Sequence, residues 1–179
     1  MSIITSTLAV AAGALAAMAC TQTQESDQRA GAAKLSSATE SADGDPAKHA
    51  RGFVENIETM TTQNQDFRRV VYTGKHLQLV LMALKPGEDI GAEVHDVDQF
   101  FRVEAGTGEV VINDRRTPIG PERAIVVPAG ARHNVINTGQ TPLQVYTVYA
   151  PPHHRDGVVH HTKPEAEHDS EHFDGRTTE

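Results

Sequence analysis

Three residues that can bind a metal ion lie close together near the middle of the chain, within residues 85–109. They are Glu93, His95 and Gln99. Glu93 and His95 are two positions apart, so on an extended strand their side chains point to the same face. Gln99 has the same parity, but a straight strand would carry it about 20 Å from Glu93. That distance is too long for a shared ion, so the spacing predicts a turn before Gln99.

The residues between the candidate ligands suit such a turn. Residues 96–98 read Asp-Val-Asp, and aspartate tolerates left-handed backbone while its side chain bonds to nearby main chain. We therefore expect two antiparallel strands, one that presents Glu93 and His95 and a second that presents Gln99. A fourth candidate ligand, His133, lies in a separate stretch, residues 126–137.

Both stretches resemble the two sequence motifs of the cupin family. The first cupin motif, G-x5-H-x-H-x3-E-x6-G, is matched at Gly87, His95 and Gly106, with Glu93 in place of the first histidine and Gln99 in place of the glutamate. The resemblance implies a single-domain, all-β barrel of the cupin or jelly-roll type. It also implies a metal site formed by residues of both motifs.

The second cupin motif, G-x5-P-x-G-x2-H-x3-N, supports the same resemblance. It is matched at Pro128, Gly130, His133 and Asn137, with Glu122 where the opening glycine belongs. Taken alone, an inward histidine is more often a core side chain satisfied by hydrogen bonds than a ligand. The joint placement of His95 and His133 at the motif positions favours metal binding, with the glycines, the proline and the asparagine serving turns and packing.

The expected metal site consists of Glu93, His95, Gln99 and His133. Two imidazoles and one carboxylate form the set that leaves coordination positions open on iron(II). Gln99 is then either a weak oxygen ligand or a hydrogen-bond donor to bound water. A neutral glutamine at the glutamate position makes the site less anionic, which should raise the Lewis acidity of the metal. The sequence leaves open whether that metal is iron, manganese, zinc or nickel.

Three functions agree with this site. The first is a metal-dependent enzyme that acts on a small polar or carbonyl-containing molecule, as a dioxygenase, an isomerase or a lyase. No catalytic acid–base pair is identified, although Tyr146, Tyr149 or a histidine after residue 150 could transfer a proton. The second is a non-catalytic periplasmic module that binds a small ligand or a metal. The third is a structural or interaction domain with a vestigial site.

Composition excludes other classes of function. The net charge of -8 argues against nucleic-acid binding, which needs a basic face. The chain has no Trp and only 4% aromatic residues, so platforms for stacking bases are not expected either. The single cysteine, Cys20, excludes an internal disulfide.

The first 20 residues are apolar and rich in small side chains, as in the apolar region of a secretory signal. Their end resembles a bacterial lipoprotein signal, in which the cysteine, here Cys20, is lipidated. This resemblance implies a periplasmic protein whose contact with the membrane is a lipid anchor. Ordinary cleaved secretion and a disordered cytosolic extension are the alternatives. Residues 21–52 are polar and small, and their composition predicts a flexible linker.

Residues 53–150 are expected to form the barrel. An arm or edge strand is expected within 53–64, no helix of useful length is expected before residue 151, and strands are expected at 67–73, 76–85, 109–113, 116–119, 124–127, 133–137 and 143–150. Both faces of 76–85 are apolar. This favours coverage of the outer face by another strand or a partner subunit, and thus a homodimer.

Residues 151–179 form a charged, proline-broken tail that is rich in histidine: His153, His154, His160, His161, His168 and His172. A metal-binding tract is one interpretation. A solvated tail that folds back along the barrel is favoured, because the spacings match no tight ligand set. In a third interpretation, His153 or His154 lines the mouth of the barrel.

Overall fold

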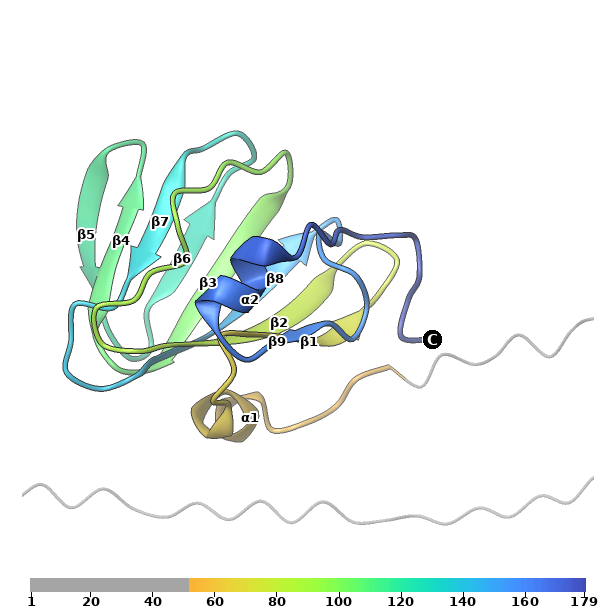
Figure 1. Cartoon of the computed structure of the whole chain (residues 1–179), viewed down its shortest axis with the longest axis horizontal. Coiled ribbons are helices and arrows are strands. Elements are labelled where there is room, and N and C mark those ends of the chain that lie inside the picture. The colour runs from red at the N-terminus through yellow and green to blue at the C-terminus, as the bar shows by residue number, and fades with distance from the viewer. Residues whose placement is uncertain (1–51) are drawn as a thin grey trace, which may run out of the picture. The chain divides into compact units, whose positions relative to one another are not determined.

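The structure is a computed structural model that describes residues 52–179 (Figure 1). The predicted signal segment and the predicted linker up to residue 51 lie outside the described residues. In the part that is described, no helix has the length and apolar character needed to cross a membrane.

The described chain is mainly β-structure, with two short helices. Its elements are α1 (Ile57–Gln63), β1 (Arg68–Thr73), β2 (Gln78–Leu84), β3 (Asp98–Ala105), β4 (Gly108–Ile112), β5 (Arg115–Ile119), β6 (Ala124–Val127), β7 (His133–Ile136), β8 (Leu143–Ala150), β9 (Val159–His160) and α2 (Lys163–His168). Most expected strands are present within two residues of the expected bounds, and the all-β prediction is confirmed.

The strands form two antiparallel sheets that share one hydrophobic core. The larger sheet has the order β6-β3-β8-β2-β1-β9, and the smaller one has the order β5-β4-β7. Val80, Phe101 and Val145 from the larger sheet and Val110 and Val135 from the smaller one belong to the same buried cluster. Alternation within each strand sends these side chains inward.

One row of inward residues in the larger sheet is polar. The strand register places Tyr149 of β8 opposite Gln78 of β2 on one side and opposite Gln99 of β3 on the other. All three residues are at most 2% exposed. The register therefore places Gln99 in a polar layer that crosses three neighbouring strands.

The prediction of an arm or edge strand in residues 53–64 is wrong, because this stretch contains helix α1. The side chain of Asn56 caps the helix by accepting the backbone N–H of Thr59 at 2.9 Å. At the other end, Gln144 Nε2 donates to the carbonyl oxygens of Thr62 and Asn64, at 2.8 and 3.0 Å. These bonds offset the weak helix propensity of a threonine-rich segment, which is why its composition did not indicate a helix.

The position of α1 also bears on the apolar outer face of β2. The helix lies against β2, β3 and β8, so a helix covers part of the face for which another strand or a partner subunit was expected. The homodimer stays a prediction from the sequence.

Residues 151–179, called the C-terminal segment from here on, return to the barrel. β9 pairs with β1 in antiparallel register, with Arg68 opposite His160. His154 and His160 are each 4% exposed, so the segment is not wholly solvated.

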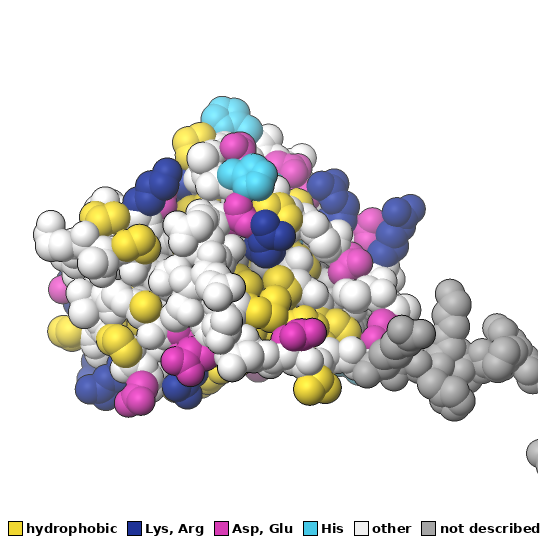
Figure 2. Space-filling model, turned by 90° about the horizontal axis from the view of Figure 1, so that it is seen from below, with side chains coloured by type: hydrophobic (Ala, Val, Ile, Leu, Met, Phe, Trp, Pro, Cys, Tyr) yellow, Lys and Arg dark blue, Asp and Glu magenta, His cyan; other side chains and the backbone are white. Residues whose placement is uncertain are grey.

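On the face shown in Figure 2, lysine and arginine side chains are dispersed among acidic ones.

Gly108 provides a test of the sheet packing. A Cβ atom there would lie 2.2 Å from the carbonyl oxygen of Ile136 and 2.9 Å from a Leu143 methyl carbon. We expect Gly108→Ala to lower the free energy of unfolding by about 1–3 kcal/mol, measured by urea denaturation. Gly120→Ala is the matched control, because its Cβ would approach nothing closer than 3.8 Å. Equal destabilisation by both changes would contradict this packing.

Candidate metal centre

Glu93 and His95 lie on an irregular stretch between β2 and β3, which corrects the prediction of a regular strand there. Glu93 forms an isolated bridge with His133, in which each backbone N–H donates to the other's carbonyl oxygen at 2.9 Å. Gly87 and Gly91 interrupt the stretch with positive φ angles of 81° and 92°. Such angles are compatible with turns but not with a continuous ladder.

The expected turn before Gln99 is present, and it connects the two motifs. Residues 96 and 97 form a bend, after which β3 starts at Asp98. Asp98 Oδ1 accepts the backbone N–H of Ala129 at 2.9 Å. In addition, the backbone N–H of Gly130 donates to the carbonyl oxygen of His95 at 2.7 Å. These bonds hold the His95 loop against the turn that precedes His133.

All four predicted ligand residues are brought together. Potential ligand atoms of Glu93, His95 and His133 lie within 4.8 Å of one another. His95 Nε2 is 3.1 Å from Glu93 Oε2, and His133 Nε2 is 4.0 Å from the same oxygen. His133 Nε2 is also 2.9 Å from Gln99 Oε1. Two ligands about 2.1 Å from one ion at right angles are separated by about 3 Å, so these spacings suit a shared ion.

The proton positions around His133 and Gln99 test whether the site fits a cation. His133 Nδ1 is 3.1 Å from the carbonyl oxygen of Ala131, which can only accept, so Nδ1 carries the proton. Gln99 Nε2 donates to Thr147 Oγ1 at 3.1 Å, which turns Oε1 toward His133. The lone pairs of His133 Nε2 and Gln99 Oε1 therefore face each other. A cation between them satisfies both, and the residues fit a metal.

Charge and burial favour the metal-binding forms of these side chains. Burial lowers the pKa of His133, although the hydrogen bond to Ala131 and the charge of Glu93 oppose this effect. Burial alone would raise the pKa of Glu93, but the hydrogen bond and charge of His95 and the charge of Arg68 lower it. At neutral pH the site thus offers a neutral imidazole and an ionised carboxylate, which metal binding requires.

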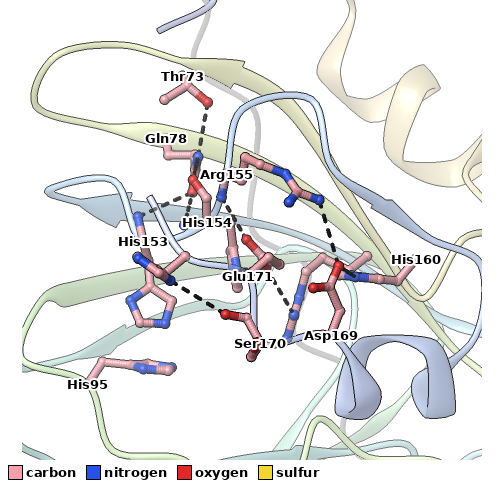
Figure 3. A network of polar contacts seen from close by, with 12 residues as sticks. Thr73, Gln78, His95, His153, His154, Arg155, His160, Asp169, Ser170 and Glu171 are labelled. Atoms are coloured by element: carbon pink, nitrogen blue, oxygen red, sulfur yellow. Dashed lines mark hydrogen bonds and ion pairs between the residues drawn. The ribbon is translucent and has the colours of Figure 1, made fainter. Parts of the chain in front are cut away.

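Aromatic rings enclose the site. The ring centroid of His153 lies 4.4 Å from that of His95 (Figure 3). The ring of Tyr149 stacks on that of His153, with centroids 5.4 Å apart. Burial, together with the charges of His154 and His95, lowers the pKa of His153 to about 4. The expectation that a tail histidine reaches the barrel mouth thus applies to His153, whereas the Nδ1 atom of His154 bonds to Glu171 at 2.7 Å.

A partly apolar cavity of about 390 Å³ lies between β4, β5 and β6, and none of the four predicted ligand residues lines it. Two of its lining residues are paired in the sheets with residues at the site: Ile112 lies opposite His133, and Ile125 lies opposite Phe101. The ring of Phe101 is 6.3 Å from that of His133. This volume is at the lower end for small-molecule pockets.

Sequence reasoning missed two charged residues beside the site, Arg68 and Glu171. Arg68 Nη2 is 3.9 Å from Glu93 Oε1, and Arg68 Nη1 is 3.8 Å from Glu171 Oε1. Arg68 has the same strand parity as the buried Val70, so a charged residue on an inward face was the signal that could have identified it. Glu171 lies in the irregular part of the C-terminal segment, where no periodicity indicates orientation.

The comparisons with known proteins identify the family of the chain. Residues 80–149 match the family Cupin_2, described as a cupin domain. The chain is 40% identical over 119 residues to the uncharacterized protein L612 of Acanthamoeba polyphaga mimivirus, a match that covers 64% of this chain and 74% of that protein. The chain belongs to the cupin family. The motif resemblance is therefore confirmed, while the four ligands of this cupin stay a prediction.

Two bacterial proteins extend the comparison. This cupin is 52% identical over 121 residues to the uncharacterized protein YrkC of Bacillus subtilis. The match covers 64% of this chain and 65% of YrkC, which is just under two thirds of its length. It also resembles the crystal structure of BH2720 from Bacillus halodurans, with a TM-score of 0.65 and 46% identity. That similarity covers 68% of this cupin and 98% of the BH2720 chain.

The buried carboxylate of Glu171 predicts a loss of stability in acid. Burial alone would raise its pKa, but hydrogen bonds from His154 and the backbone N–H of Arg155, with the charges of His154 and Arg68, lower it to about 2 from 4.5. Its contribution is fully present above pH 4.5 and is lost as the pH falls toward 2. The difference corresponds to at most about 3 kcal/mol.

The measurement is urea unfolding of the wild type and Glu171→Gln between about pH 7 and about pH 3. We expect the variant to be less stable at neutral pH and the two stabilities to converge in acid, because protonation removes the same charge from the wild type. Parallel stability curves would contradict the assignment.

Proposed function

We propose that this cupin is a metal-dependent enzyme that binds one divalent transition metal through Glu93, His95, Gln99 and His133. Its proposed substrate is a small polar or carbonyl-containing molecule. The observation that carries the proposal is that potential ligand atoms of Glu93, His95 and His133 lie within 4.8 Å of one another, with Gln99 Oε1 2.9 Å from His133 Nε2. When Nδ1 carries the only ring proton of His133, Nε2 and Gln99 Oε1 are both buried acceptors, and a cation bound by both would satisfy them.

The donor set indicates the kind of metal. Two imidazole nitrogens, one carboxylate and one amide oxygen suit iron, manganese, zinc or nickel better than calcium or magnesium, which prefer oxygen ligands alone. Glu93 is the one anionic ligand among the four. When bound, the ion would keep part of its positive charge and polarise an oxygen atom of the substrate as a Lewis acid.

The residues around the donors support small-molecule chemistry. Phe101, Tyr149 and His153 pack around the two ligand histidines, and His133 is only 2% exposed. In such surroundings electrostatic interactions act more strongly than in water.

The alternative is a non-catalytic module that binds a small ligand or a metal. The observation in its favour is His153, whose ring covers His95 at 4.4 Å and restricts access from the C-terminal segment. An enzyme should lose turnover on His133→Ala while it keeps its fold, whereas a binding module should show ligand-dependent thermal stabilisation without product.

Three further proposals rest on sequence alone. They are export to the periplasm, a lipid anchor at Cys20 and a homodimer. Residues 1–20 and the apolar character of residues 76–85 support them.

Metal content tests the proposed function directly. We expect wild-type protein that starts after Cys20 and carries no affinity tag to hold about one ion per chain, measured by elemental mass spectrometry. The double variant His95→Ala/His133→Ala should lose it, because both nitrogen ligands are gone.

The identity of the metal then selects the assay. Iron would lead to oxygen-uptake measurements, and zinc, manganese or nickel to isomerase and lyase screens. If wild type and double variant are equally empty after incubation with excess metal, the metalloenzyme proposal fails.

A further inference from the structure

The guanidinium of Arg68 lies between two carboxylates that come from distant parts of the chain. One is Glu93 of the proposed metal site, and the other is Glu171 of the C-terminal segment, at 3.9 and 3.8 Å. The two oxygens of Glu93 face different ways: Oε2 lies 3.1 Å from His95 Nε2, whereas Oε1 is the atom nearest Arg68. Arg68 therefore faces the oxygen that is turned away from the two histidines.

Glu171 is firmly held in this position. Its side chain is 2% exposed, and Oε1 accepts from His154 Nδ1 at 2.7 Å. Oε2 accepts the backbone N–H of Arg155, also at 2.7 Å. His154 is fixed in turn, because its backbone N–H and carbonyl oxygen bond to the side-chain amide of Gln78 at 2.8 and 2.7 Å. Figure 3 shows Glu171 beside His154 and Arg155 in this network.

The backbone of Arg68 is held by the same segment. Arg68 pairs with His160 in the register of β1 and β9, and His160 Nε2 lies 3.2 Å from Asp169 Oδ2. The C-terminal segment thus contacts both the main chain and the charged group of Arg68. Its position determines where that charge lies relative to Glu93.

Stability alone does not account for this arrangement. The Arg68 side chain is 11% exposed, its two ion pairs are long, and its Nε atom is buried without a hydrogen-bond partner. A stabilising arginine pair is usually short and bidentate, and burial of a poorly bonded guanidinium is costly. The geometry instead suits a charge that attracts Glu93 Oε1 from a distance without withdrawing the carboxylate from the histidines.

We propose that Arg68 and Glu171 are positioning residues that orient Glu93 for metal binding, so that the C-terminal segment is part of the metal site. This inference rests on the proposed metal site and adds a regulator of its affinity. Arg68 holds Oε1 and leaves Oε2 directed at the ion. Glu171 balances the charge of Arg68, which would otherwise repel the ion and draw Glu93 away.

Binding of Co²⁺ tests the pair, because the visible absorption of this ion reports its coordination geometry. We expect Arg68→Met and Glu171→Gln each to weaken Co²⁺ binding about tenfold, the lower end of the effect of residues that orient ligands. The spectrum should change in Arg68→Met, and Arg68→Lys should restore part of the affinity.

Thr178→Val is the matched control. Thr178 lies on the same segment, where its hydroxyl accepts the backbone N–H of Thr73 and donates to Asp156 Oδ1, each at 2.8 Å. Its replacement loosens the segment without touching Arg68, Glu171 or the residues that hold them. We expect wild-type Co²⁺ affinity in this variant. Equal weakening in Thr178→Val would show a general loss of packing and overturn the inference.

Other outcomes separate the inference from the proposed function. If Arg68→Met and Glu171→Gln bind as wild type does while His133→Ala abolishes binding, the positioning role fails and the metal site stands. Tighter Co²⁺ binding by Arg68→Met would show that the charge of Arg68 only repels the ion. This result would also overturn the positioning role. If the wild type takes up no Co²⁺, both proposals fail. Circular dichroism checks that each variant is folded. If Arg68→Met is unfolded, the Co²⁺ affinities of Arg68→Lys and Glu171→Gln test the positioning role instead.

Discussion

The facing lone pairs of His133 and Gln99 are the constraint on which the rest of the site depends. His133 Nδ1 donates to the carbonyl oxygen of Ala131, and Gln99 Nε2 donates to Thr147 Oγ1. In the neutral form of His133, Nε2 and Gln99 Oε1 are then two buried acceptors 2.9 Å apart. Such a pair is expensive in an apolar core, and the barrel holds it in place through two rigid strands, β3 and β7. An ion bound by both atoms would remove this unfavourable contribution.

Strand register extends this polar centre across the larger sheet. Tyr149 lies between Gln78 and Gln99, and all three point inward at the same level. Gln99 reaches the proposed metal site, whereas Gln78 bonds to the main chain of His154. One polar layer thus joins the ligands on one side to the C-terminal segment on the other. This explains how a segment far away in the sequence comes to pack beside the ligands.

Much of the barrel could be predicted because local signals were clear. Alternating apolar residues and turn glycines located the strands, and the motif spacing brought together Glu93, His95, Gln99 and His133 in one hypothesis. Helix α1 could not be predicted, because its stability comes from Asn56 and Gln144 rather than from propensity. Glu171 could not be predicted either, since its orientation depends on long-range contacts with His154 and Arg68.

The charge balance of the site explains why those long-range contacts matter. With Gln99 at the position where the motif has a glutamate, Glu93 is the one carboxylate of the proposed ligand set. A guanidinium nearby, Arg68, would cancel that charge and disfavour a cation. Glu171 offsets Arg68, so the three groups together keep one negative charge at the site. A divalent ion held there would keep a net positive charge, and a carboxylate outside the ligand set would control how much.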